Sequence, residues 1–488
     1  MKKYKTFITV LMAGIGIMTA TSCSDSFLDL APKSNMNEKD FYKSASDFAT
    51  ARISAYATLY NEYGPASGMS YTEMLTDETE ANEGKLLVGS NDGISTTDVY
   101  PFSTYSLEPS NTAVKHFWQM GYSDLNIINK TLDNLNASGD FANTTIGLQY
   151  KAELRFLRAL YHFNLVRIFG DIPIVTHSMT VPESYKVMRS ATDDVYNFII
   201  DELKFSIENL PMKSAKTISG QITKGAAETC LGEVYLTRGS KKEAAAILKS
   251  VIDSKKYSLV DNYADLWSLN RKNSEESILE IQYVAGAGKP SSPYFEYYAP
   301  FENFSITAQG YGLNQVTSIL YKSYEENDPR REASIATSFI DRSGNKISTL
   351  FEKKWIDSTY IKNHSYYYDN NFIVYRYADV LLMYAEAAND AEYLNQVRAR
   401  VGLPGFGTPG FPSDKYPSLE LAIEHERNVE LALEFHRWFD LKRTGRATVI
   451  ISSAKNKQIT NDMLVLPIPQ TEIQNNPALT QNNYYMNK

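Results

Sequence analysis

The spacing of apolar and polar residues predicts a mostly α-helical protein. In several segments the apolar side chains recur every three or four positions, which is the period of a helix that buries one face. These segments fall into about four pairs, each expected to form a helical hairpin. The pairs are 46–60 with 113–135, 149–170 with 192–210, 222–238 with 241–253, and 375–401 with 419–443. A short break is expected near Asn389 and Asp390.

Two long stretches, 61–110 and 256–372, lack this helical period. They are rich in glycine, serine, threonine, aspartate and aromatic residues, a composition typical of loops. The second stretch holds 13 of the 34 tyrosines. We expect the two stretches to be irregular inserts that fold together as a cap on the helical scaffold.

The last predicted helix carries an unusual stripe of charges. On a helix, apolar residues would flank this stripe on both sides, so the charges should meet other helices rather than water. The stripe consists of Glu426, Arg427, Glu430, Glu434 and Arg437. Buried carboxylates need cationic partners, and Arg155 and Arg158 are candidates. A catalytic acid and base would instead need a cleft and unequal environments, which nothing in the sequence supplies.

The N-terminus has the pattern of an export signal. Lys2, Lys3 and Lys5 precede an apolar run over 7–20, which is short for a membrane span. Small residues then precede Cys23, as in a relaxed form of the bacterial lipobox. Cleavage would leave Cys23 as a lipid-carrying first residue, and several acyl chains would anchor the protein to a membrane. A secreted soluble protein with an incidental Cys23 is the alternative.

These features divide the chain into three parts. We expect a signal peptide over 1–22, a lipidated N-terminus and tether over 23–40, and one domain over 41–488. The only other cysteine, Cys230, lies in an apolar helical stretch and is expected to be a core residue.

Charge and motifs exclude several classes of function. The net charge of −8 argues against binding to nucleic acid. The pattern GxGxxG at Gly405, Gly407 and Gly410 follows a helix and not a strand, so it does not predict dinucleotide binding. His425 lacks the second histidine of a zinc helix, and the sequence at 91–93 is only a fragment of a calcium loop. We therefore predict no cofactor and no metal.

Four segments resemble the SusD/RagB family of Bacteroidetes outer-membrane lipoproteins, which are glycan-binding partners of TonB-dependent transporters. The segments are ERNVELALEFHRWFDLKRTG at 426–445, QYKAELRFLRALYHFNLVRIFG at 149–170, the helical stretch at 375–403, and the closing segment at 464–484. Asp328-Pro329-Arg330 is similar to a further element of the family. The resemblance implies a tetratricopeptide-like α-α superhelix and a position facing the cell exterior.

Tyrosine-rich inserts on a helical frame suit carbohydrate binding. A sugar ring has an apolar C–H face and a hydroxyl rim, so its site pairs flat aromatic faces with a few polar groups. The resemblance places ligand contacts in the inserts without fixing single residues. The candidates are Tyr294, Tyr297, Tyr298, Tyr311, Tyr100, Tyr105, Asp77 and Asn111. The alternative is that these aromatic residues form the core of the inserts.

Three functions compete at this point. The first is a non-catalytic cell-surface glycan receptor that delivers nutrient to a SusC-like TonB-dependent transporter. The second is a helical-repeat lipoprotein that binds peptide or protein. The third is a surface glycosidase, which would need a carboxylate pair beside the aromatic site.

Overall fold

A computed structural model describes residues 41–81, 95–301, 310–356 and 368–486. The signal peptide, Cys23, the tether and the fragment at 91–93 lie outside these residues. Residues 48–488 form one compact unit, separate from residues 1–47, and the following description concerns that unit. None of the described helices is both long and apolar enough to cross a bilayer.

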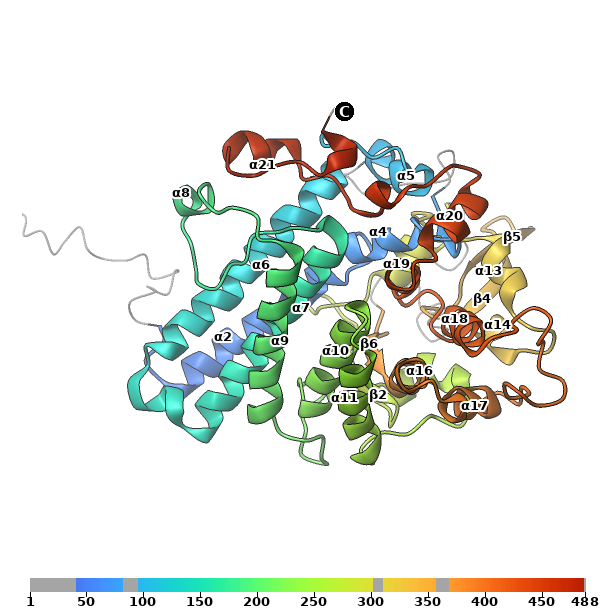
Figure 1. Cartoon of the computed structure of the whole chain (residues 1–488), viewed down its shortest axis with the longest axis horizontal. Coiled ribbons are helices and arrows are strands. Elements are labelled where there is room, and N and C mark those ends of the chain that lie inside the picture. The colour runs from blue at the N-terminus through green and yellow to red at the C-terminus, as the bar shows by residue number, and fades with distance from the viewer. Residues whose placement is uncertain (1–40, 82–94, 302–309, 357–367, 487–488) are drawn as a thin grey trace, which may run out of the picture. The chain divides into compact units, whose positions relative to one another are not determined.

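Helices dominate the structure, as the periodicity predicts (Figure 1). The helices of the scaffold are α2 (Ala45–Ala57), α3 (Leu59–Glu62), α6 (Thr112–Asn136), α7 (Thr145–Phe169), α8 (Val181–Ser184), α9 (Thr192–Asn209), α10 (Lys224–Thr237), α11 (Lys241–Asp253), α16 (Tyr377–Ala388), α17 (Ala391–Arg400), α18 (Leu419–Glu430), α19 (Arg437–Arg443), α20 (Ala447–Lys455) and α21 (Gln470–Asn475).

The longer scaffold helices pack one on the next in chain order. α6 packs on α7, α7 on α9, α9 on α10, α10 on α11, α11 on α16, and α16 on both α17 and α18. α7 is the central member, because almost every side chain from Ala152 to Phe169 is buried. Thr144 caps its first turn by accepting a hydrogen bond from Gly147 N (3.1 Å), and Gly170, with φ 76°, ends it.

Three of the four predicted hairpins are present, and the break near Asn389 is confirmed. The pairing of 46–60 with 113–135 is wrong, since α6 packs mainly on α7. The hydrogen bonds from α2 also go to α7, where Arg52 and Tyr56 both donate to Glu153 (2.7 Å each). A buried carboxylate on α7 therefore fixes the position of α2.

The predicted helix over 419–443 is interrupted. α18 ends at Glu430 and α19 begins at Arg437. In the turn between them, Leu433 and Phe435 have φ of 66° and 68°, a conformation that costs about 1–3 kcal/mol for each non-glycine residue. Both side chains are buried, and Leu433 N donates to Glu78 (3.0 Å). Tertiary contacts therefore hold a strained turn that helical periodicity could not reveal.

The two inserts contain short helices and strands. These are α4 (Gly68–Glu73), α5 (Thr96–Thr104), α12 (Tyr294–Tyr298), α13 (Ser318–Ser323), α14 (Pro329–Ser334), β1 (Thr79–Glu80), β2 (Ser277–Ile281), β3 (Gln315–Val316), β4 (Ile335–Ile340), β5 (Lys346–Glu352) and β6 (Phe372–Arg376). The described strands form three antiparallel pairs: β1 with β3, β2 with β6, and β4 with β5.

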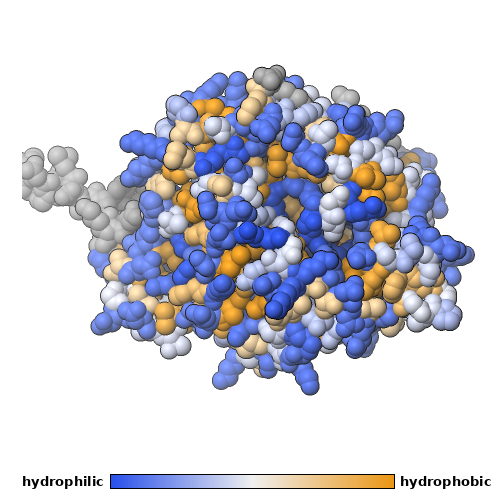
Figure 2. All heavy atoms as spheres, in the orientation of Figure 1, coloured by the Kyte–Doolittle hydropathy of each residue, from blue (hydrophilic) through white to orange (hydrophobic). Residues whose placement is uncertain are grey.

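The inserts are joined to each other, as expected. In the β1–β3 pair, Thr79 lies opposite Val316 and Glu80 opposite Gln315. Side chains of the second insert also donate to the first, from Thr317 Oγ1 to the carbonyl of Asp77 (2.6 Å). The surface in the view of Figure 2 is largely polar, with separate apolar patches.

Candidate functional site

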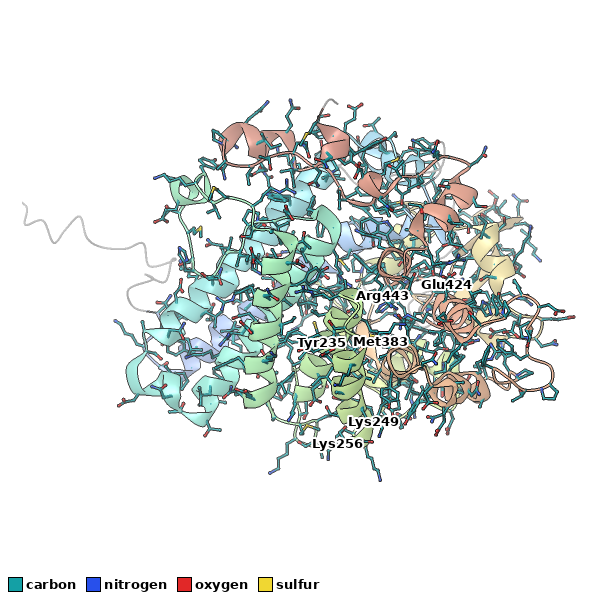
Figure 3. The ribbon with its side chains drawn as sticks, viewed as in Figure 1. Tyr235, Lys249, Lys256, Met383, Glu424 and Arg443 are labelled. Atoms are coloured by element: carbon teal, nitrogen blue, oxygen red, sulfur yellow. The ribbon has the colours of Figure 1, made fainter. Side chains whose placement is uncertain are left out.

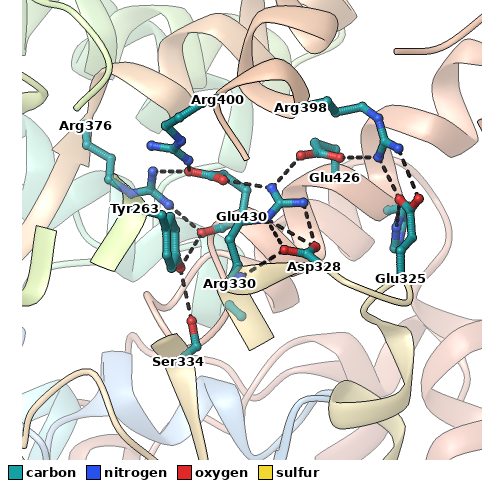
Figure 4. Close-up of polar contacts among 12 residues, drawn as sticks. Tyr263, Glu325, Asp328, Arg330, Ser334, Arg376, Arg398, Arg400, Glu426 and Glu430 are labelled. Atoms are coloured by element: carbon teal, nitrogen blue, oxygen red, sulfur yellow. Dashed lines mark hydrogen bonds and ion pairs between the residues drawn. The ribbon is translucent and has the colours of Figure 1, made fainter. Parts of the chain in front are cut away.

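The predicted charged stripe is buried in an ion-pair network at the base of the second insert (Figure 4). Glu426 and Glu430 project from α18, and both accept from Arg330 Nη1, at 2.5 and 2.8 Å. Glu430 also pairs with Arg376 (2.5 Å) and with Arg400. These side chains are almost completely inaccessible to solvent.

The cationic partners are not those predicted. Arg155 and Arg158 instead pair with Glu202 on α9, the helix that packs on their own helix α7 (2.7 Å each). The stripe is neutralised by residues that come from α14, β6, α17 and the turn after β5, namely Arg330, Arg376, Arg398, Arg400 and Lys354. Arg330 lies in the Asp328-Pro329-Arg330 element, and Arg376, Arg398 and Arg400 lie in the stretch 375–403, so both regions of family resemblance contribute to the network.

The network keeps its carboxylates ionised. Burial opposes ionisation of Glu430, but Arg400, Arg376 and Arg330 outweigh it and hold its pKa well below the ordinary value. For Glu434, burial is likewise outweighed by Arg376 and Lys354, so its pKa is also lowered. Two carboxylates with lowered pKa values in a site without a cleft do not form an acid–base pair. The network is therefore a structural joint between α18 and the second insert.

A second group of buried carboxyls has the opposite electrostatics. Burial raises the pKa of Glu73 to about 7, and it raises the pKa values of Glu78 and Glu352 above the ordinary range. Raised pKa values often mark catalytic acids. However, all three side chains are completely enclosed, so no substrate can reach them. They too belong to the frame of the inserts.

Two of the predicted ligand-binding tyrosines, Tyr294 and Tyr298, lie in the core. Tyr294 stacks on Trp355 and Phe372, with ring centroids 4.7 and 5.2 Å apart, and its hydroxyl donates to the carbonyl of Tyr63. Tyr298 is equally inaccessible. The prediction that these rings face a ligand is wrong, because both are buried in the apolar core of the insert.

Tyr105, Asp77 and Asn111 also have structural roles. Tyr105 is buried and donates to the carbonyl of Leu75 (2.8 Å). Asp77 forms a bidentate ion pair with Arg437 (2.9 Å for each bond). Asn111 caps α6 by accepting from Val114 N (3.0 Å). Polar groups that already have partners in the protein are poorly placed to bind a ligand, so these three predictions are corrected.

Tyr297 and Tyr311 are brought together at the surface. Their rings stack with centroids 4.7 Å apart and an angle of 13° between the planes. Both side chains are partly exposed. Tyr100 on α5 is likewise partly exposed. The structure thus leaves three of the six predicted tyrosines with accessible surface, and two of them form one stacked pair, the aromatic platform.

The backbone around the platform is fixed by hydrogen bonds. Tyr311 N donates to the carbonyl of Glu296 (3.0 Å), and Leu313 N donates to the carbonyl of Tyr297 (2.9 Å). The chain approaches so closely that a Cβ on Gly310 would lie 2.1 Å from the carbonyl oxygen of Pro300. Only glycine fits at that position. The platform is therefore held in place before any ligand arrives.

A carboxyl lies beside this platform. Glu296 is half-buried, and burial raises its pKa. A carboxyl next to a flat aromatic surface can accept hydrogen bonds from sugar hydroxyls. No group of three or more metal-ligating side chains occurs among the described residues.

Comparison with known proteins identifies the family. The SusD family model matches residues 275–485, and a second model, described as starch-binding and associating with the outer membrane, matches residues 26–236. SusD-like protein P2 of Formosa agariphila is 26% identical over 530 residues, which cover 99% of each chain. Starch-binding protein SusD of Bacteroides thetaiotaomicron is 28% identical over 38% of this chain and 33% of its own length.

The solved structures agree in fold. A laminarin-binding SusD-like protein is 28% identical, with a TM-score of 0.76 over 91% of this chain and 100% of its own. A surface glycan-binding protein A from Bacteroides thetaiotaomicron, in complex with laminarihexaose, has a TM-score of 0.74 over 90% of this chain and 100% of its own, at 21% identity.

The chain belongs to the SusD/RagB family, with the helical tetratricopeptide-like fold of that family. The family comprises glycan-binding proteins without catalytic activity, so the chain is a binding protein and not an enzyme. The family description also supports association with the outer membrane.

Proposed function

We propose that this protein is a cell-surface glycan receptor that captures a polysaccharide or oligosaccharide and delivers it to a TonB-dependent outer-membrane transporter. The stacked pair Tyr297 and Tyr311 is the observation that carries the proposal, because a fixed pair of partly exposed rings offers an outward ring face and aromatic edges to the C–H groups of a sugar. Family membership supports the ligand class.

The remaining parts of the proposed site follow from its surroundings. Glu296 adjoins the platform and would accept hydrogen bonds from hydroxyl groups at the rim of the sugar. Tyr100 offers a further partly exposed ring from the first insert. The β1–β3 pair holds the two inserts together, which would present both to one ligand.

The membrane attachment is part of the same proposal. Lipidation at Cys23 would hold the receptor on the outer membrane, facing the exterior, where large glycans arrive. The polar tether over 23–40 would let the domain reach its transporter partner. Metabolic labelling with a palmitate analogue tests the anchor: wild-type protein should carry the label and Cys23→Ala should not.

A glycan screen on the soluble chain that starts after Cys23 tests the function. Laminarin and starch should be tried first, because matched proteins are named for binding them. We expect retardation in at least one affinity gel and no release of reducing ends. Binding of peptides without any glycan would contradict the proposal, and release of oligosaccharide products would show an enzyme instead.

A further inference from the structure

A pocket lies in a part of the fold that does not include the aromatic platform, since neither Tyr297 nor Tyr311 belongs to its lining. It has a volume of about 390 Å³, which is in the range of small-molecule sites, and three distant segments line it. These are the middle of α6, the segment around α8, and α21 with the residues after it, which lie together at the upper left of Figure 1. We propose that this pocket is a second binding site for a neutral saccharide.

The apolar part of the lining is aromatic on two sides. Trp118 and Tyr122 of α6 form one wall, with ring centroids 4.9 Å apart. Tyr185, which is 40% exposed, contributes from the segment that follows α8. Rings from two separate segments can contact a sugar through its C–H groups.

The polar part of the lining is neutral. Asn475 and Ser123, which are both exposed, present an amide and a hydroxyl that match sugar hydroxyls as donors and acceptors. The one carboxylate in the lining, Glu472, already accepts a hydrogen bond from Gln119 (2.7 Å). With that carboxylate engaged and no lysine or arginine in the lining, the pocket suits an uncharged ligand.

Hydrogen bonds hold the three segments that line the pocket in fixed positions. Asn476 donates to the carbonyl of Val187 (2.8 Å), and Arg189 donates to the carbonyl of Thr480 (2.8 Å). Asn126 also accepts from Met179 N (2.8 Å). Each bond ties two of the three lining segments together, so the walls keep their spacing without a ligand.

The ligand class rests on the proposed function, and the test separates the two sites. In a Tyr297→Ala/Tyr311→Ala background, calorimetric titration with laminaribiose and maltose should still show binding of at least one of them. Adding Tyr185→Ala or Asn475→Ala should weaken that binding at least tenfold. Tyr235→Ala on α10, a part of the fold away from the pocket (Figure 3), is the matched control and should change nothing.

Three results would overturn the second site. One is that the background variant binds no sugar although the wild-type protein does, which would leave the proposed function intact. Another is that Tyr185→Ala and Asn475→Ala bind as the background does. The third is that the pocket variants bind sugar normally but associate less with the transporter, which would assign the pocket to a protein partner.

Discussion

The two faces of α12 both carry tyrosines but differ in their exposure to solvent. On one face, Tyr294 and Tyr298 enter an aromatic core in which every ring packs on protein. On the other face, Tyr297 stacks on Tyr311 and keeps part of its surface in water. The same residue type thus builds the frame on one face and keeps accessible surface on the other. The rotational position of each residue on a five-residue helix makes the difference.

The first prediction concerns the buried ion-pair network that joins α18 to the second insert, which contains α12. Glu430→Gln would leave Arg330, Arg376 and Arg400 without their shared carboxylate, and removing one partner of a buried ion pair costs about 3–5 kcal/mol. Chemical denaturation should show this loss of unfolding free energy. Glu424→Gln, on the same helix (Figure 3) and paired with the partly exposed Arg446, should lose no more than about 1 kcal/mol. Equal losses would contradict the structural role of the network.

The second prediction separates the two faces directly. Tyr294→Ala should lower the unfolding free energy by about 3–5 kcal/mol, because it opens a cavity among Trp355 and Phe372. Tyr297→Ala should cost about 1 kcal/mol or less and weaken glycan binding at least tenfold. Denaturation and calorimetry on both variants provide the comparison. If Tyr297→Ala bound glycan normally, the platform would lose its assigned role.

The third prediction uses pH to test a buried carboxyl of the scaffold, Glu62 on α3. Burial raises the pKa of Glu62 to about 8, above its ordinary value of 4.5, so the folded state favours the neutral acid. Stability should therefore fall as pH rises from about 4.5 to 8, by up to about 1.4 kcal/mol per unit. Glu62→Gln keeps the acceptor for Asn164 and should make this slope less steep, while the exposed Glu208→Gln should leave it unchanged. An unchanged slope in Glu62→Gln would contradict the buried-acid assignment.

The smallest effect concerns the hydroxyl of the platform. Tyr311→Phe keeps the stacked ring and removes only its polar tip, so glycan affinity should fall by less than tenfold. Tyr311→Ala, which removes the ring, should lose clearly more. Affinity gels are sufficient to rank the two variants. If both lost binding equally, hydrogen bonding and not stacking would be the main contribution of this residue.

Helical periodicity predicted the frame well, because a helix that buries one face repeats its apolar residues at a fixed interval. α7 and α10 lie where that repeat placed them. The turn at Leu433 and Phe435 could not be predicted, since two apolar residues with positive φ are held there by contacts that are distant in sequence.

The sequence predicts a tyrosine-rich region for the candidate site, but it does not show which of these rings face outward. The ligand-binding candidates include Tyr297 and Tyr311, which are partly exposed, but also Tyr294 and Tyr105, which are buried in the core. A predicted loop gives no helical phase, so sequence alone could not sort the inward rings from the outward rings. The sequence also does not show which arginines pair with Glu430, because ion pairs depend on which helices are adjacent in the fold. Arg158 pairs with Glu202 on the adjacent helix α9 and not with Glu430.

A crystal structure of the soluble chain with its bound glycan would test the central claim most directly. We predict that a sugar ring lies against the outward face of one ring of the Tyr297–Tyr311 stack, with a hydroxyl within hydrogen-bonding distance of Glu296. A glycan ordered elsewhere on the molecule, with the two tyrosines bare, would contradict it.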